Sequence, residues 1–328
     1  MKAIHVISTR PISNYYVSRS EGAPYRQEDF EILTTVLSAL EWRRHNGVIR
    51  LYTDPAGQEF YDRLGLLGLW DGGVDTERLE QRSPAINCGV FWSFGKVVAL
   101  RHEEAPCCLM DTDLIVWDSI RRLVTADVMS LHEEPLDFAA YVGRDELTAA
   151  PGFDWDGLDW SVAPRSAALL LFMTDTFKNE YADRALSFME GNPIRSEPGG
   201  ALPAHPIFVE QRLLPMCAKA SGVPVGSFLR DYRGTELPSG QPNTMFTHLW
   251  NAKTLLHHHP ERRRDLCRRY ASRIRRDYPD TAAVLMRSDI LREHFRTPPP
   301  GSAGWVAGSD HGAGQGGGAH QADQHECC

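Results

Sequence analysis

Short segments rich in β-forming residues alternate with a segment of helical spacing through the first 110 residues, and this alternation constrains the fold most. Residues 2–9, 48–53 and 106–110 have the composition and length of strands. Between the first two, apolar residues recur at helical spacing, namely Ile32, Leu33, Val36, Leu37 and Leu40. Strands joined by helices in this order form parallel sheets with helices on their faces. The sequence therefore predicts an α/β fold.

The second half of the chain continues the pattern. We expect strands near residues 138–142 and 167–173, and the second is apolar throughout, as a strand buried on both faces should be. Apolar spacing predicts helices over residues 176–189 and 206–220. Residues 253–295 are expected to be helical and are rich in arginine.

Composition sets the domain limits and excludes some functions. We expect an α/β domain over residues 1–255, a basic helical extension packed on it over 256–297, and a disordered Gly-rich tail over 298–328. A net charge of −8 argues against nucleic acid as a partner. The sequence has neither a run of about 20 apolar residues nor a signal-peptide pattern, which predicts a cytoplasmic protein.

Two carboxylates one residue apart, Asp111 and Asp113, follow the apolar segment that ends at Met110. Acidic oxygens are ligands of divalent cations, and the carboxyl end of a buried strand is where α/β sheets bind phosphates. The pair therefore predicts a site for a metal ion and a diphosphate. The alternative is that one of these aspartates caps the following turn.

Three further residues have side chains suited to such a site. His248 and Lys253 lie five positions apart, and a neutral imidazole can complete a metal site while an ammonium group neutralises phosphate charge. Asp54 follows the strand expected at residues 48–53, where it can bind the base or ribose of a nucleotide. A turn-forming role before Pro55 explains Asp54 equally well.

Three segments together resemble the glycosyltransferase-A family of nucleotide-diphospho-sugar transferases. The first, residues 91–120, has a helix with a basic residue, then an apolar strand and the Asp-x-Asp motif. The second, residues 208–215 (FVEQRLLP), resembles the acidic-Gln helix start near the sugar pocket. The third, residues 247–253 (THLWNAK), resembles the late His and Lys of the glycogenin-like retaining enzymes. The late segment differs from the His-x-x-Gly-x-x-Lys-Pro-Trp pattern of those enzymes, since Asn251 replaces Gly and the lysine comes one position early.

The resemblance implies a glycosyltransferase-A-like, Rossmann-like and mostly parallel sheet and a set of residue roles. Asp111 and Asp113 would hold Mn²⁺ or Mg²⁺ and the donor diphosphate, with His248 as a third metal ligand. Lys253 would contact the diphosphate, and Lys96 would approach the donor. The donor implied is a nucleotide-diphosphate sugar, with a uridine diphosphate (UDP) sugar favoured.

Side chains for the sugar or the acceptor are also present. Glu210 and Gln211 can each accept or donate paired hydrogen bonds to hydroxyl groups, and Glu210 is a candidate base if the enzyme inverts configuration. The alternative places both in an exposed first turn of a helix, where Glu is favoured. Trp155 and Trp160 can stack on sugar faces or pack in the core.

The sequence therefore predicts a metal-dependent glycosyltransferase that acts on a carbohydrate, lipid-linked or small-molecule acceptor. One alternative is a non-catalytic nucleotide-sugar-binding or scaffold protein of the same fold. Another is a haloacid-dehalogenase-like phosphatase, which shares the apolar strand and Asp-x-Asp, although no later acidic pair follows an apolar strand. The arginines around Arg262, Arg263 and Arg264 predict possible peripheral contact with the inner face of a membrane.

Overall fold

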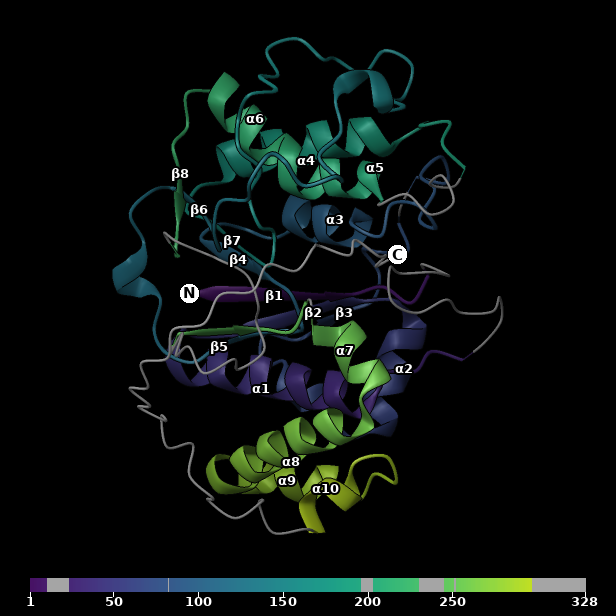
Figure 1. The fold of residues 1–328 in the computed structure, drawn as a ribbon, viewed down its shortest axis with the longest axis vertical. Coiled ribbons are helices and arrows are strands. Elements are labelled where there is room, and N and C mark those ends of the chain that lie inside the picture. The colour runs from purple at the N-terminus through teal and green to yellow at the C-terminus, as the bar shows by residue number, and fades with distance from the viewer. Residues whose placement is uncertain (11–23, 82, 196–202, 230–244, 251, 297–328) are drawn as a thin grey trace, which may run out of the picture.

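A seven-stranded sheet forms the centre of the computed structural model (Figure 1). The structure describes residues 1–10, 24–81, 83–195, 203–229, 245–250 and 252–296. The strand order is β3-β2-β1-β4-β7-β6-β8. The strands are β1 Lys2–Ile7, β2 Ile49–Thr53, β3 Val74–Asp75, β4 Cys107–Met110, β6 Val128–Ser130, β7 Leu169–Phe172 and β8 Val225–Ser227. The tail predicted over residues 298–328 lies outside the described residues.

The sheet is mostly parallel, as the sequence predicted. Strand β1 pairs parallel with β2 and β4, β2 pairs parallel with β3, and β6 pairs parallel with β8. The exception is β7, which runs antiparallel to both β4 and β6. The chain is therefore a mixed α/β protein in which the carboxyl ends of β1, β2 and β4 share one edge of the sheet.

The prediction of a strand at residues 138–142 is wrong. The segment is a turn, because the amide of Tyr141 donates to the carbonyl of Phe138 (N···O 2.9 Å) and Phe138 is exposed. The strand in this part of the chain is β6, ten residues earlier, which pairs with one edge of β7 and has buried side chains. The two short strands β3 and β8 were also not predicted from the sequence.

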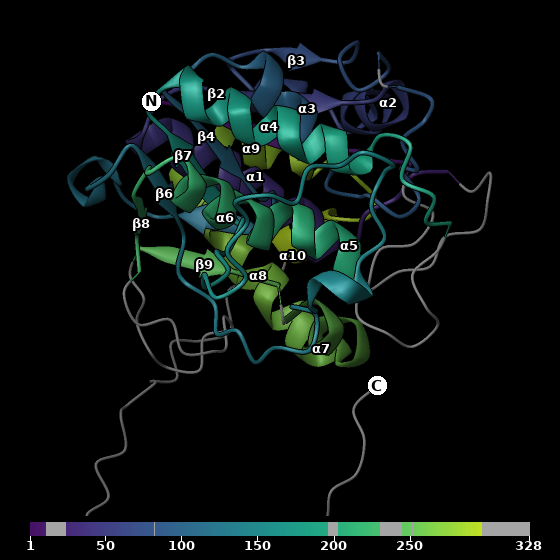
Figure 2. The same ribbon diagram turned by 90° about the horizontal axis from the view of Figure 1, so that it is seen from above.

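Helices cover both faces of the sheet, and each face has its own apolar core. One face carries α3 (Phe94–His102), α4 (Asp175–Met189), α5 (Ala204–Ile207) and α6 (Leu213–Ala220). Figure 2, which looks down on this face, shows α4 and α6 side by side in front of the sheet. The short helix α2 (Pro55–Arg63) follows β2, and α1 (Asp29–His45) covers the opposite face.

Helix α1 is buried along most of its circumference because it lies between the sheet and the C-terminal helices. Its first turn has a capping box, in which the Glu28 amide donates to the carboxylate of Glu31 (N···O 2.8 Å). Near its end, the fully buried Trp42 donates from its indole nitrogen to the carbonyl of Val48 (3.2 Å). This contact ties α1 to the start of β2.

The C-terminal helices are α7 (Ala252–His258), α8 (Pro260–Asp277), α9 (Pro279–Leu285) and α10 (Arg292–Arg296). Their apolar side chains share a core with α1, and α7 runs across the domain limit predicted at residues 255 and 256. Arg273 binds the buried Glu41, whereas Arg262 and Arg264 are exposed. Membrane contact through this segment stays a prediction. None of the helices in the described ranges is long and apolar enough to cross a bilayer.

Candidate metal and diphosphate site

A small second sheet brings the Asp-x-Asp segment and His248 together. Strand β5 (Leu114–Val116) pairs antiparallel with β9 (Phe246–His248), and Leu114 lies opposite His248. After β4 the chain turns, because the Leu114 amide donates to the carbonyl of Asp111 (3.1 Å). The carbonyl of Asp113 then accepts from the amide of Leu249 (3.1 Å). These backbone contacts fix both carboxylates and the imidazole at the carboxyl end of β4.

Asp111, Asp113 and His248 form a compact group of possible metal ligands. Their ligand atoms all lie within 4.8 Å of one another. His248 Nε2 is 3.6 Å from Asp113 Oδ1, which is too long for a hydrogen bond, and this nitrogen is buried with no hydrogen-bond partner among the described residues. A buried polar atom without a partner costs free energy, and a cation placed between the three groups would remove that cost. Two carboxylates and an imidazole are ligands suited to Mn²⁺ or Mg²⁺.

Two lysines contact the same carboxylates. Lys96 Nζ, on α3, is 2.6 Å from Asp111 Oδ1, and Lys253 Nζ, on α7, is 2.8 Å from Asp113 Oδ2. Burial would raise the pKa of Asp113, but Lys253 and His248 outweigh it and hold that pKa well below its usual value. Burial likewise opposes the charge of Lys96, yet Asp111 and Glu210 raise the pKa of Lys96 above its usual value. Asp113 and Lys96 are therefore charged at neutral pH.

The charges of this site favour a cation together with an anion. The ammonium groups of Lys96 and Lys253 balance the carboxylates of Asp111 and Asp113. A divalent cation bound to the carboxylates would leave the site positive and free the ammonium groups for another anion. A diphosphate is such an anion, since it binds both metal ions and ammonium groups.

Glu210 joins this cluster, and Gln211 does not contact it. Both lie on a π-helical segment, Phe208–Arg212, between α5 and α6, and such segments are frequent at functional sites. Glu210 is buried with its Oε1 3.1 Å from Lys96 Nζ, so the alternative of an exposed first helical turn is wrong for it. Burial raises the pKa of Glu210 above its usual value. The side-chain oxygen of Gln211 instead accepts from the hydroxyl of Tyr141 (2.5 Å).

Asp54 caps a helix in the structure. Its carboxylate is buried at the start of α2, where it accepts from the Gly57 amide (2.9 Å) and from both the amide and the hydroxyl of Thr9 (2.6 and 2.9 Å). No hydrogen bond or ion pair of the described residues joins Asp54 to the metal-ligand group. The turn-forming role considered for it is present, and contact with a nucleotide stays a prediction.

The two tryptophans considered as sugar platforms pack inside the protein. Trp160 stacks on Phe208 with ring centres 5.7 Å apart, and Trp155 lies edge-on to Phe188. Both are partly buried against the core between the sheet and α4. The structure therefore gives them a packing role.

A chain of buried hydrogen bonds from Trp70 through His5 and Ser38 reaches the backbone next to the metal-ligand group, and it was not predicted from the sequence. The Trp70 indole donates to His5 Nδ1 (3.2 Å), which requires the neutral tautomer with the proton on Nε2. That nitrogen therefore donates to the Ser38 hydroxyl (3.1 Å), which donates to the carbonyl of Leu114 (2.5 Å). Leu114 directly follows Asp113. The only signal in the sequence was a histidine inside an apolar strand.

Replacing Ser38 with Ala is expected to lower the free energy of unfolding by about 1–3 kcal/mol. The change leaves the carbonyl of Leu114 and the imidazole of His5 buried without this partner. Urea denaturation measures the effect. Replacing Ser187, which is exposed on α4, with Ala is the matched control and should change stability by less than about 0.5 kcal/mol. Equal effects of the two changes would show that the hydrogen-bonded chain contributes little.

Comparisons with protein-family models and with curated proteins find no match for the sequence. Similar solved structures include the glycosyltransferase GlyE of Streptococcus pneumoniae TIGR4, with 13% identity and a TM-score of 0.31 over 69% of this chain. Mouse xyloside xylosyltransferase 1 has 10% identity and a TM-score of 0.34 over 69% of this chain. An active-site mutant of LgtC has 11% identity and a TM-score of 0.30 over 72% of this chain.

This chain spans 44% of the GlyE chain, 85% of the xylosyltransferase and 88% of LgtC. At these identities and TM-scores the likeness assigns no activity, substrate or residue role to the chain. The roles proposed for residues of this chain therefore rest on the contacts and charges of its own side chains.

Proposed function

We propose that this protein is a metal-dependent glycosyltransferase of the glycosyltransferase-A type. It would move a sugar from a nucleotide-diphosphate donor, with a UDP-sugar favoured, to a carbohydrate, lipid-linked or small-molecule acceptor. The observation that carries the proposal is the group formed by Asp111, Asp113 and His248, whose ligand atoms lie within 4.8 Å of one another beside two lysines. A divalent cation with ammonium groups beside it suits the negative charge of phosphate esters and anhydrides.

Asp111, Asp113 and His248 would hold Mn²⁺ or Mg²⁺. When bound, the cation would neutralise the charge that develops on the diphosphate as the bond to the sugar breaks. Lys253 lies against Asp113 and would turn from that carboxylate to a phosphate oxygen. Lys96 would hold Asp111 on one side and the donor on the other, since its ammonium group has three hydrogens to donate.

Glu210 would act on the sugar side of this site. Its carboxylate is held by Lys96, so it lies one ammonium group away from Asp111. A buried carboxylate with a raised pKa is suited to accept a proton from an acceptor hydroxyl or to bind sugar hydroxyls. Gln211 would supply a second contact by exchanging its hydrogen bond with Tyr141 for one with a hydroxyl of the sugar or the acceptor.

A thermal-shift screen of nucleoside diphosphates and nucleotide sugars, with and without Mn²⁺, tests this proposal. A ligand at about 100 times its dissociation constant stabilises the folded state by about 2.7 kcal/mol. For a domain of this size we expect UDP or a UDP-sugar with Mn²⁺ to raise the melting temperature by roughly 5 °C or more. Either ligand without the metal should give a much smaller shift.

Two outcomes of the screen would contradict the proposal. Indifference to every nucleotide would favour a scaffold protein of the same fold. A response to phosphate analogues alone, without any preference for a nucleotide, would favour a phosphatase.

A further inference from the structure

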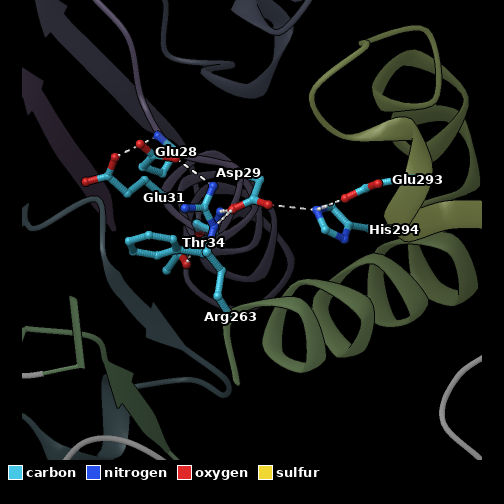
Figure 3. Close-up of polar contacts among 8 residues, drawn as sticks. Glu28, Asp29, Glu31, Thr34, Arg263, Glu293 and His294 are labelled. Atoms are coloured by element: carbon cyan, nitrogen blue, oxygen red, sulfur yellow. Dashed lines mark hydrogen bonds and ion pairs between the residues drawn. The ribbon is translucent and has the colours of Figure 1, made fainter. Parts of the chain in front are cut away.

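A second group of metal-ligand side chains lies where α1, α8 and α10 meet, and it is separate from the site described above. Asp29 begins α1, Cys267 lies in α8 and His294 lies in α10. Their ligand atoms lie within 4.8 Å of one another. The residues are 7%, 0% and 3% exposed, so the group is buried. Figure 3 shows Asp29 between Arg263 and His294.

The two oxygens of Asp29 have different partners. Oδ1 accepts from Arg263 Nε (2.6 Å), and the same guanidinium donates to the carboxylate of Glu28 (2.6 Å). Oδ2 lies 2.8 Å from His294 Nε2. Metal-bound carboxylates are commonly oriented by a hydrogen bond to their other oxygen, which is the role that Arg263 has here. Oδ2 therefore remains available as a ligand next to the imidazole and the thiol.

A cavity of about 190 Å³ opens beside this group. Its lining includes Asp29, His294 and His257. The Nε2 atom of His257 is buried with no hydrogen-bond partner in the described structure. The cavity thus provides a path for an ion and room for a fourth ligand, either water or the imidazole of His257.

The donor atoms indicate which ion fits. A sulfur, a nitrogen and one carboxylate oxygen are typical of zinc, whereas Mg²⁺, Mn²⁺ and Ca²⁺ favour sites in which oxygen ligands predominate and no thiolate is present. Asp29 and the thiolate of Cys267 would together neutralise the two charges of the ion, and Glu28 already pairs with Arg263. The Asp111, Asp113 and His248 group has no thiol, so the two sites favour different metals.

We propose that Asp29 Oδ2, Cys267 Sγ and His294 Nε2 bind a zinc ion whose fourth ligand comes from the adjacent cavity. On binding, the Cys267 thiol releases its proton to solvent, and the proton of His294 Nε2 moves to Nδ1 so that the neutral ring coordinates the ion. The three ligands belong to three helices, and α1 is more than 200 residues away from α8 and α10 in the sequence. The ion therefore fastens α8 and α10 to the start of α1, independently of any transfer reaction.

Cobalt substitution tests this site, because Co²⁺ takes zinc positions and absorbs in the near ultraviolet only when a thiolate binds it. We would use the full chain with Cys327→Ser and Cys328→Ser, which removes the terminal thiols outside the described residues. We expect the thiolate charge-transfer band to saturate at one equivalent of Co²⁺ per thiol-containing site, because Co²⁺ bound at Asp111, Asp113 and His248 has no thiolate ligand and adds nothing to the band. Cys267→Ser should abolish the band, and zinc should displace the cobalt.

The matched control is Cys217→Ser, which removes another buried free thiol, on α6, and should keep the band. If Cys267→Ser fails to fold, His294→Gln keeps the thiol and should weaken Co²⁺ binding by at least ~10-fold. Absence of the band in the parent chain, or its survival in Cys267→Ser, would overturn the proposal. So would unchanged Co²⁺ affinity in His294→Gln.

Discussion

Replacing Asp113 with Asn is expected to weaken Mn²⁺ binding by at least ~100-fold. Loss of a residue that only supports a metal ligand already lowers metal affinity by up to ~100-fold, and Asp113 is itself a proposed ligand. Asn keeps the size of the side chain but removes the charge that both the cation and Lys253 require. The same change removes a carboxylate charge that balances the ammonium group of Lys253, so more of that positive charge acts against the metal. Equilibrium dialysis with Mn²⁺ measures the affinity directly.

The matched control for this prediction is Asp118→Asn. Asp118 follows β5 in the same segment, and its side chain is 69% exposed and belongs to no metal-ligand group of the described residues. Its replacement should leave the Mn²⁺ affinity unchanged. If Asp113→Asn binds Mn²⁺ as tightly as Asp118→Asn does, the ion is bound elsewhere and the proposed site is wrong. A melting curve shows that each variant is folded.

The second large effect is a dependence of stability on pH that comes from His5. Burial lowers the pKa of His5 from 6.5 to about 3, against a smaller opposite effect of Asp113. Between these values the unfolded chain binds a proton at this position and the folded chain does not. The free energy of unfolding that the neutral His5 ring contributes is therefore fully present above about pH 6.5 and is lost as the pH falls towards 3. The loss approaches ~1.4 kcal/mol for each pH unit.

Urea denaturation between pH 7 and pH 4 measures this dependence in the parent chain and in His5→Gln. Gln can donate to Ser38 and accept from Trp70 without titrating, so the variant should lose less stability on acidification. His132, whose pKa burial lowers to about 4, contributes equally to both proteins and cancels in the comparison. His258→Gln, which changes an exposed histidine, should keep the parental slope. Equal slopes for His5→Gln and the parent would contradict the assignment.

The parts of the fold that were predictable from the sequence depend on contiguous residues. The apolar run of β4 and the two aspartates after it are adjacent, so both the strand and its ending were visible in one segment. The helical spacing of α1 and α4 was similarly local. Strands β3 and β8 are too short for a periodic pattern and take their conformation from the neighbouring strand.

The parts of the candidate site that were not predictable depend on distant pairings. The contact between His248 and Asp113 follows from pairing of β5 with β9, which lie more than 100 residues apart. In the sequence, His248 was a candidate ligand from its side-chain chemistry and from the family resemblance, and no local pattern placed it beside Asp113. Glu210 was expected at a helix start and lies instead in a buried π-helical segment, because α5 and α6 form one continuous helical stretch. Cys267 gave no signal and His5 gave only that of a histidine inside an apolar strand, since a single buried side chain has no pattern.

In the proposed function, Asp111 and Asp113 bind a metal ion that in turn binds a nucleoside diphosphate. Calorimetric titration of UDP tests it most directly, with the parent chain in excess Mn²⁺, the parent chain in EDTA, and the Asp111→Ala/Asp113→Ala double variant in excess Mn²⁺. We expect binding in the first titration and at least ~100-fold weaker binding in the other two. Equal binding of UDP in all three titrations would contradict it.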